Sequence, residues 1–363
     1  MILTPDSMKF SIVTPSFSQL SWLKLCIASV RDQVAQASDE NAEKDETGDL
    51  NRNEVEIAVG KPEGTRTKIS IEHIVQDAGT EGIEEFAREV GAGFYQDGKK
   101  VFSAQCISWS PQRPVSSNLG SVSDQLSAGY SLTIYSEKDA GMYDAVNKGL
   151  RKASGDICAY LNCDEQYLPG TLRWVADYFS LSPETEVLFG AAVVTKADGT
   201  YRADRRVMPP TRWHTMVSGN LSFFTSSTFF RRTSVVERGL LLDPQWRVCG
   251  DAVWALRFLE AGLRMQSTHR PLSAFAETGV NMSAVGNARA AEESRRLASS
   301  APAVVRALRP AVLLAYRLRR WWNGAYALNP HSYAVYTAGH PDRRQRFDVD
   351  SPNFRWRMGA ESD

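Results

Sequence analysis

The sequence predicts an α/β fold with a mostly parallel central sheet and helices on both of its faces. Short β-branched and apolar runs alternate along the chain with segments whose apolar residues recur at helical spacing. Such alternation is typical of strand–helix–strand units, in which successive strands run parallel. The chain has 363 residues, 43% of them hydrophobic, which can bury one large core or two modest ones. A globular enzyme is therefore the default expectation.

Two strand–helix units are predicted in the N-terminal part. Residues 9–15 form a β-branched run stopped by proline, and residues 20–34 have apolar residues at helical spacing. Residues 36–67 are rich in Asp, Glu, Asn, Lys and Gly and have few large apolar side chains, so we expect an inserted surface loop. A second strand over 68–75 and a helix over 83–90 follow.

The alternation resumes after a second expected insertion over 96–130, which is rich in Ser, Gln, Pro and Gly. The elements expected next are a strand over 131–135, a helix over 142–153, a strand over 156–161, a helix over 169–181, a strand over 187–194, a hydrophobic segment over 221–230 and a helix near 251–261. We expect one α/β domain over 1–280, followed by a C-terminal helical extension and tail over 281–363.

Residues 303–322 predict an amphipathic helix that carries five arginines and two tryptophans. Pro310 should kink this helix or mark its start. Two interpretations are open. The helix packs on the protein body or on a partner, or it makes peripheral contact with a membrane interface, which would suit a lipid-linked acceptor.

Charge and cysteine content limit the classes of partner. The chain has 42 basic and 42 acidic residues, so attraction of the whole molecule to nucleic acid is not indicated. Its five cysteines show no metal-ligand spacing, and no run of about eighteen apolar residues occurs. We expect a cytoplasmic protein without a signal peptide or membrane span, or one bound peripherally at the inner face of the cell membrane.

The residues that carry chemistry gather around one predicted strand. Residues 137–149 are dense in polar groups, and Asp164 and Glu165 follow the buried strand over 156–161. Acids at the carboxyl end of a strand lie where open α/β sheets bind ligands. Carboxylate oxygens are ligands that Mg²⁺ and Mn²⁺ prefer. This arrangement indicates a metal-assisted transferase.

Several ordered motifs resemble those of one enzyme family. They are Ile12-Val13-Thr14-Pro15-Ser16-Phe17, His73-Ile74-Val75-Gln76-Asp77, Gly141-Met142-Tyr143-Asp144-Ala145-Val146-Asn147-Lys148-Gly149, Asn162-Cys163-Asp164-Glu165, Ser227-Thr228-Phe229-Phe230-Arg231-Arg232 and Gly250-Asp251. In this order they resemble family 2 glycosyltransferases of bacterial polysaccharide assembly. The resemblance covers about residues 9–275 without the insertions. It implies the glycosyltransferase type A (GT-A) fold, a Rossmann-like fold of nucleotide-diphospho-sugar transferases.

The resemblance assigns five residues to the nucleotide-sugar donor. Thr14 and Pro15 match the opening turn whose backbone and hydroxyl face the nucleotide base. Asp77 matches a carboxylate that hydrogen-bonds the base or ribose, although alanine follows it where the family usually has glycine. Asp139 is expected near the nucleotide, and Lys148 is expected to neutralise the diphosphate.

The resemblance also assigns the metal and the general base. Asp164 and Glu165 occupy the position of the family's acidic signature, which binds Mg²⁺ or Mn²⁺, with Asp164 as direct ligand and Glu165 acting through water. Asp251 matches the general base, although an acid at the start of a helix also stabilises that helix. The implied reaction is inverting transfer of a hexose-type sugar from a nucleotide-diphosphate donor to a hydroxyl of a glycan or lipid-linked saccharide.

Two other interpretations stay open. A non-catalytic glycan-assembly or scaffolding protein would keep the fold without turnover, but the intact Asp164 and Asp251 argue against it. A sugar nucleotidyltransferase should carry a glycine-rich, basic phosphate loop after the first strand, and the segment over 14–18 lacks one. The glycosyltransferase interpretation is therefore preferred.

Overall fold

The computed structural model describes residues 7–35, 67–104, 129–218, 221–279, 281 and 288–356. Its strands are β1 (Ser7–Ser16), β2 (Lys68–Asp77), β3 (Gly93–Gln96), β4 (Lys99–Phe102), β5 (Tyr130–Ser136), β6 (Ile157–Tyr160), β7 (Glu165–Tyr167), β8 (Val187–Lys196), β9 (Tyr201–Arg205), β10 (Thr228–Arg231), β11 (Met265–Glu277), β12 (His331–Thr337) and β13 (His340–Val349). Its helices are α1 (Leu20–Ala35), α3 (Ile83–Glu89), α5 (Met142–Lys152), α6 (Thr171–Leu181), α7 (Arg212–Ser218), the 3₁₀ turn η1 (Thr225–Ser227), α8 (Arg232–Val235), α9 (Gly250–Glu260), α10 (Ala288–Ser299), α11 (Ala303–Ala307) and α12 (Arg309–Trp322).

An eleven-stranded sheet forms the centre of the molecule, in the order β4-β3-β5-β2-β1-β6-β10-β8-β11-β7, with β9 paired to β8. The ladders β3–β5, β5–β2, β2–β1, β1–β6 and β8–β11 are parallel. The predicted α/β class with a mostly parallel central sheet is therefore confirmed. Residues 36–66 and 105–128, which make up most of the two expected insertions, lie outside the described residues.

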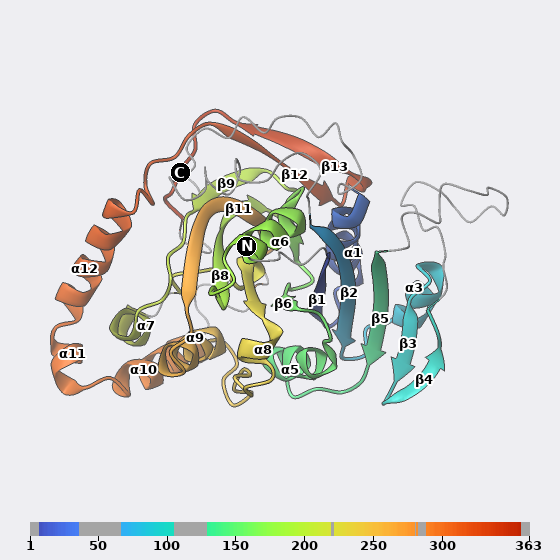
Figure 1. Cartoon of the computed structure of the whole chain (residues 1–363), viewed down its shortest axis with the longest axis horizontal. Coiled ribbons are helices and arrows are strands. Elements are labelled where there is room, and N and C mark those ends of the chain that lie inside the picture. Colours follow the sequence, from blue (N-terminus) through green and yellow to red (C-terminus); the bar gives the residue numbers. More distant parts are fainter. Residues whose placement is uncertain are drawn as a thin grey trace.

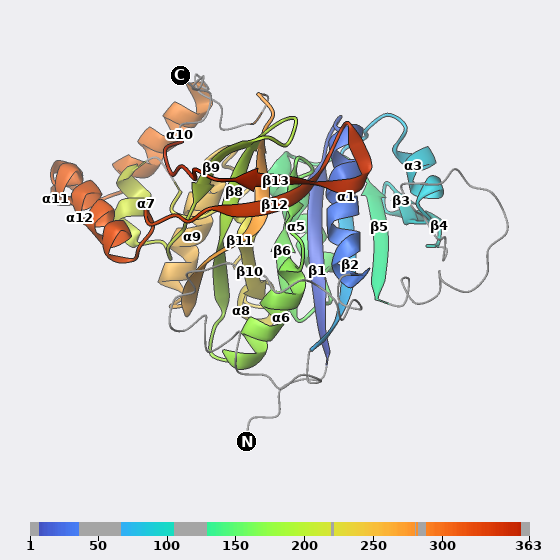
Figure 2. The ribbon, with the colours of Figure 1, turned by 90° about the horizontal axis from the view of Figure 1, so that it is seen from above.

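Helices cover both faces of the sheet, as Figures 1 and 2 show. Strand β1 explains the layering, because its side chains alternate between the faces. Phe10 and Ile12 pack in the same cluster as residues of α1 and α6. Val13 points the other way, into the cluster formed by α5 and α9. Helix α5 lies so close to β1 that a Cβ on Gly149 would meet Val13 at 2.4 Å.

The parallel strands bring their carboxyl ends to one edge of the sheet. Ser16 at the end of β1 pairs with Asp77 at the end of β2, and Asp77 pairs with Ser136 at the end of β5. In the next ladder, Val13 pairs with Tyr160, the last residue of β6. The segments that follow these strands therefore start side by side, where open α/β sheets bind ligands.

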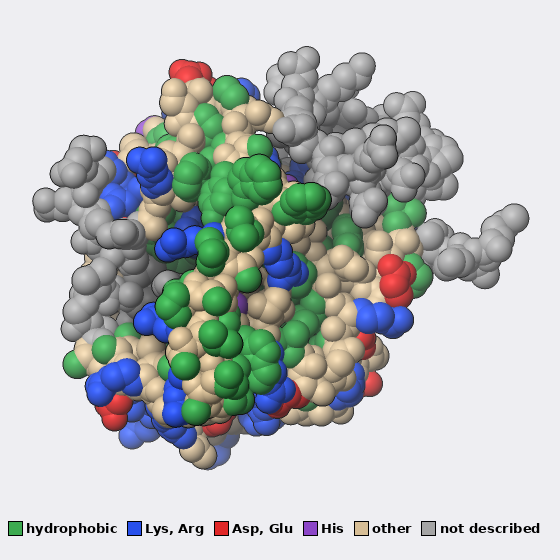
Figure 3. Space-filling model, turned by 90° about the vertical axis from the view of Figure 1, so that its left-hand side faces the viewer, with side chains coloured by type: hydrophobic (Ala, Val, Ile, Leu, Met, Phe, Trp, Pro, Cys, Tyr) green, Lys and Arg blue, Asp and Glu red, His purple; other side chains and the backbone are tan. Residues whose placement is uncertain are grey.

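Helices α10, α11 and α12 line one side of the molecule, and Figure 3 shows the surface of that side. Pro310 lies in the first turn of α12, so it marks the start of this helix rather than a kink within it. Within the described ranges, no helix has the length and apolar character needed to cross a membrane.

The C-terminal part expected as helical extension and tail also contains an antiparallel hairpin, β12–β13. Tyr333, Val335 and Val349 face a small core with Leu168 and Val193 of the central domain. The hairpin was not predicted from the sequence because its two strands obtain most of their apolar partners from distant segments. The division into domains at residue 280 stays a prediction, since the hairpin packs directly on the α/β core.

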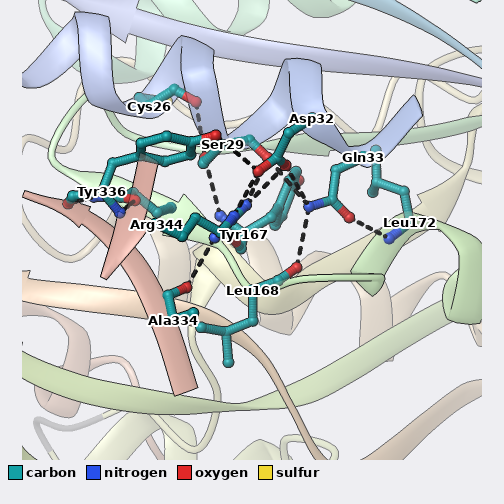
Figure 4. A network of polar contacts seen from close by, with 11 residues as sticks. Cys26, Ser29, Asp32, Gln33, Tyr167, Leu168, Leu172, Ala334, Tyr336 and Arg344 are labelled. Atoms are coloured by element: carbon teal, nitrogen blue, oxygen red, sulfur yellow. Dashed lines mark hydrogen bonds and ion pairs between the residues drawn. The ribbon is translucent and has the colours of Figure 1, made fainter. Parts of the chain in front are cut away.

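A buried ion pair joins the hairpin to α1, as Figure 4 shows. The guanidinium of Arg344 donates to both carboxylate oxygens of Asp32, at 2.5 and 2.9 Å. It also donates to the carbonyls of Tyr167 and Ala334, at 2.8 and 2.9 Å. Tyr336 adds a hydroxyl donor to Asp32 at 3.0 Å. One side chain of β13 therefore holds together α1, β7 and β12.

Candidate functional site

Asp251 lies in the first turn of α9, where two tyrosine hydroxyls contact its carboxylate. Tyr160, at the end of β6, donates to Oδ1, and Tyr143, in the first turn of α5, donates to Oδ2 at 3.2 Å. Burial raises the pKa of Asp251 to about 6, although both tyrosine hydrogen bonds act to lower it. A carboxylate that titrates near neutral pH is suited to accept a proton from a hydroxyl group.

The Tyr143 hydroxyl has a second acceptor. It lies 2.9 Å from the carbonyl oxygen of Val248, in the loop before α9. A hydroxyl has one proton to donate, so Tyr143 shares that proton between Val248 and Asp251. Oδ2 of Asp251 is therefore the less firmly bonded carboxylate oxygen, and Oδ1 is the one that Tyr160 holds.

Glu293 of α10 binds the loop that precedes α9, the helix that carries Asp251. Its carboxylate accepts hydrogen bonds from the backbone N–H groups of Arg247, Val248 and Cys249, each at 2.9 Å. These donors precede α9, where a negative charge is favourable. Burial alone would raise the pKa of Glu293, but the three backbone donors and Arg289 lower it overall. The sequence analysis missed Glu293 because nothing in its local pattern distinguishes it from an ordinary helix acid.

Asp164 and Glu165 follow β6, and the charge of Asp251 acts on the carboxyl group of Glu165. Asp164 is half-buried and accepts a hydrogen bond from the side-chain amide of Asn281 at 3.1 Å, and burial raises its pKa to about 6. Glu165 is 2% exposed, and its Oε2 accepts from the backbone N–H of Asn162 at 2.8 Å. Burial and the neighbouring charges of Asp164 and Asp251 raise the pKa of Glu165 to about 8. The structure thus places Asp164 and Glu165 after β6, with Glu165 close enough to Asp251 for their charges to interact.

The two acids after β6 differ in their fitness to bind a metal. The described residues contain no group of three or more His, Cys, Asp or Glu side chains that could hold a metal ion. Asp164 offers a half-buried carboxylate, which fits the one or two protein carboxylates that Mg²⁺ uses beside substrate phosphates. Glu165 is buried and bonded to Asn162, so in this arrangement it supports the loop. Its expected role as a ligand through water stays a prediction.

The side chains expected to contact the nucleotide base point into the protein. Thr14 is fully buried, and its hydroxyl lies 2.9 Å from Nε2 of His73. Pro15 is buried beside it. Asp77 is fully buried, and its carboxylate accepts from the backbone N–H groups of Gly79 and Thr80, both at 2.8 Å, and from the Thr80 hydroxyl at 2.5 Å.

These bonds stabilise the turn after β2, in which Gly79 has a positive φ of 97°. The glycine thus stands one residue later than in the family's pattern, which explains how alanine is tolerated at position 78. The Thr14 hydroxyl and the Asp77 carboxylate are both hydrogen-bonded within the protein. Nucleotide binding by Thr14, Pro15 and Asp77 stays a prediction.

The residues expected near the donor diphosphate lie at the start of α5. Asp139 accepts a hydrogen bond from the backbone N–H of Gly141 at 2.7 Å. Lys148 donates to the carbonyl of Lys138 at 2.5 Å and pairs with Asp144 at 3.6 Å. Both side chains thus shape the turn that begins α5.

The structure adds a basic residue at this turn, because the side chain of Arg247 lies over Gly141. A Cβ on Gly141 would come within 2.0 Å of the guanidinium, and the φ of 111° there also favours glycine. The sequence analysis missed Arg247, whose only signal was its position four residues before Asp251. Lys148 and Arg247 together give the start of α5 two positive charges.

Residues 126–240 match the family model described as "Glycosyl transferase family 2". The match covers less than half of the chain. The matched segment includes α5, Asp164 and Glu165, whereas Asp251 lies outside it, as do Thr14 and Asp77. The match supports the expected GT-A fold, and the sheet topology shows its mixed α/β class with a mostly parallel central sheet.

Three solved structures are similar to this chain at low sequence identity. S. aureus TarS 1-349 has 11% identity and a TM-score of 0.42, and the match covers 74% of this chain and 61% of that one. S. aureus TarS has 12% identity and a TM-score of 0.46, covering 86% and 44%. Mannosyltransferase PcManGT from Pyrobaculum calidifontis, in complex with GDP-Man and Mn²⁺, has 12% identity and a TM-score of 0.44, covering 90% and 86%. This chain therefore spans less than two thirds of the TarS chains, and no curated protein matches its sequence.

Glu165→Gln should change how the stability of the protein depends on pH. The folded state keeps the Glu165 proton up to a pKa of about 8, whereas the unfolded state loses it near the usual 4.5. The wild type is therefore expected to lose stability as pH rises between these values, and the glutamine variant lacks this loss. We expect the variant to gain on the order of 3 kcal/mol in unfolding free energy, relative to wild type, from pH 4.5 to pH 8.

Chemical denaturation at both pH values measures the effect of this substitution. Glu85→Gln is the matched control, because Glu85 is an exposed glutamate on α3 and should show no such gain. A Glu165→Gln variant whose stability follows that of the wild type at both pH values would contradict a protonated Glu165.

Proposed function

We propose that this chain is an inverting glycosyltransferase. It moves a hexose-type sugar from a nucleotide-diphosphate donor to a hydroxyl of a glycan or lipid-linked saccharide in cell-surface polysaccharide biosynthesis. The observation that carries the proposal is the Asp251 carboxylate, which Tyr143 and Tyr160 hold, with Tyr160 at the end of β6, the strand that Asp164 follows. The family match supports the reaction class.

In the proposed reaction, Asp251 takes the proton of the acceptor hydroxyl. The acceptor oxygen attacks the anomeric carbon as the bond from that carbon to the diphosphate oxygen breaks, and the nucleotide diphosphate leaves. This single displacement inverts the anomeric centre. The proton goes to Oδ2, because Tyr143 can turn its own proton fully to the Val248 carbonyl while Tyr160 continues to donate to Oδ1.

The donor side of the site follows from the charges around α5 and β6. Lys148 and Arg247 supply positive charge for the diphosphate, with Asp139 shaping the turn between them. Asp164 would hold a Mg²⁺ or Mn²⁺ ion, which stabilises the charge on the departing diphosphate when it is bound. The acceptor hydroxyl, with Asp251 as its base, would attack the anomeric carbon from the side opposite the departing diphosphate.

Thermal unfolding with nucleotides tests the donor site. The purified chain is heated with UDP, GDP, dTDP and CMP, each with and without Mn²⁺. A ligand of the folded state raises the midpoint by mass action, so we expect one nucleotide to give a metal-dependent increase of several degrees. The increase should be lost in Asp164→Asn, because that side chain no longer offers two anionic oxygens.

The exposed Asp198, in the turn between β8 and β9, provides the matched control. Asp198→Asn should keep the full nucleotide shift. If no nucleotide changes the midpoint of the wild type, the donor site is wrong and the non-catalytic interpretation is favoured. If Asp164→Asn shifts as much as the wild type, Asp164 does not bind the metal.

A further inference from the structure

The outward face of α11 and α12 carries a continuous apolar stripe. Val304 and Leu308 are four residues apart, as are Leu314 and Leu318, and Trp321 and Trp322 follow; each of these six side chains is more than half exposed. Trp322 is 84% exposed. Figure 3 shows hydrophobic side chains as a green band over this side of the molecule, with blue basic side chains beside it. We call these six residues the apolar stripe.

The opposite face of the same helices packs on the protein body, so the orientation of the stripe is fixed. Val305 and Val312 join a small core with Met216 and Val217 of α7. Tyr316 stacks on His214 of α7, with 3.5 Å between ring centroids. The inward face of these helices therefore already has its apolar partners on α7, and the apolar stripe is a separate, outward-facing apolar surface. Exposed apolar surface of this extent, rimmed by polar groups, marks an interaction site.

The charge around the stripe selects the occupant. Between Glu293 and Asp342 the sequence has no acidic residue and seven arginines, at positions 295, 296, 306, 309, 317, 319 and 320. Arg306 and Arg309 donate to backbone carbonyls, which leave their positive charge uncompensated. A second copy docked by a two-fold axis would bring arginine against arginine. Anionic lipid headgroups beside an apolar interior match both the charge and the stripe.

We propose that α11 and α12 bind the surface of an anionic lipid bilayer, with the apolar stripe at the boundary between headgroups and acyl chains. The tryptophans at the end of α12 suit that boundary, since an indole has an apolar body and one N–H donor. The exposed side chains of Arg306, Arg309 and Arg317 contact the headgroup phosphates. This binding needs no nucleotide or catalysis, so it goes beyond the proposed function.

The stripe is connected to the candidate site through packed helices. Helix α12 contacts α7, and α7 contacts both α9, which carries Asp251, and α10, which carries Glu293. A bilayer bound at the stripe would therefore be separated from the α9 helix by α7. This placement favours an acceptor that is itself anchored in the membrane.

Vesicle sedimentation with the full chain tests the proposal. The vesicles are pure phosphatidylcholine, or phosphatidylcholine with about 30% phosphatidylglycerol. The wild type should sediment with the anionic vesicles and stay in solution with the neutral ones. The double variant Leu314→Glu/Leu318→Glu should bind at least about tenfold more weakly, because it places two charges in the apolar stripe. Arg306→Gln/Arg317→Gln should also weaken binding and reduce its salt dependence.

The matched control is Val101→Glu on β4, which is an exposed apolar residue outside the stripe, and it should bind as the wild type does. Thermal midpoints check that every variant folds, and a nucleotide-induced shift reports on the donor site separately. No sedimentation with anionic vesicles overturns the proposal, and so does equal binding to neutral ones. A dimer in light scattering that dissociates in Leu314→Glu/Leu318→Glu, without vesicle binding, would assign the stripe to a second copy instead.

Discussion

Asp251→Asn is expected to lower kcat for sugar transfer by about 10²- to 10⁴-fold, the usual contribution of a general base. The amide keeps the size of the side chain and can still accept from Tyr160, but it cannot take the acceptor proton. Donor binding should be unchanged, because Asp251 acts on the acceptor. The nucleotide-induced rise in thermal midpoint should therefore be the same in the variant and the wild type.

The pH dependence of the wild type gives a second readout for Asp251. Only the ionised carboxylate accepts a proton, so kcat should rise with pH through the pKa of about 6 and level off above it. Glu260→Gln, at the exposed end of the same helix, is the matched control and should keep both kcat and the pH profile. A kcat within a few fold of wild type in Asp251→Asn would assign the base to another group.

Arg344→Met is expected to lower the free energy of unfolding by about 3 kcal/mol, because it leaves the partly buried Asp32 charge without its cationic partner. Arg344 makes two charge-assisted bonds to Asp32 and further bonds to three backbone carbonyls, those of Ser29, Tyr167 and Ala334. The hairpin β12–β13 should loosen from α1 as a result. Urea denaturation measures the loss in stability.

Arg346→Met provides the control for Arg344→Met from the same strand. Arg346 pairs with Asp348 on the surface, where its side chain is 65% exposed, so its loss should cost at most about 1 kcal/mol. The double variant Asp32→Asn/Arg344→Met should lose less stability than the sum of its single changes, because it removes both charges. Equal costs for Arg344→Met and Arg346→Met would show that the ion pair does not hold the hairpin.

Much of the fold could be predicted from the sequence, because local patterns report local structure. The β-branched run of β1 and the helical spacing of α5 and α9 each depend on residues within one element. The placement of Asp164 and Glu165 after a buried strand followed from the same patterns. The hairpin β12–β13 was not predicted, since Tyr333 and Val335 obtain their apolar partners from β8 and from Leu168.

The chemistry of the site depended on contacts that a sequence pattern does not contain. Tyr160 and Asp251 are 91 residues apart in the chain, yet one hydrogen bond joins them. Glu293 lies more than 40 residues after the loop that it binds. The Thr14 hydroxyl is likewise bonded to His73 of the neighbouring strand β2, whereas the Asp77 carboxylate is bonded by the turn that follows β2.

The amino-acid sequence by itself determined the strand–helix alternation, the α/β class, the acids that follow β6 and the amphipathic character of residues 303–322. These properties depend on spacing along the chain, which local backbone geometry converts directly into strands, helices and faces. The tertiary structure alone decided which acid is paired, which is buried and which apolar face stays exposed. Burial and hydrogen bonding depend on residues brought from elsewhere in the chain, and these two factors decide the pKa of Asp251 and the outward direction of the apolar stripe.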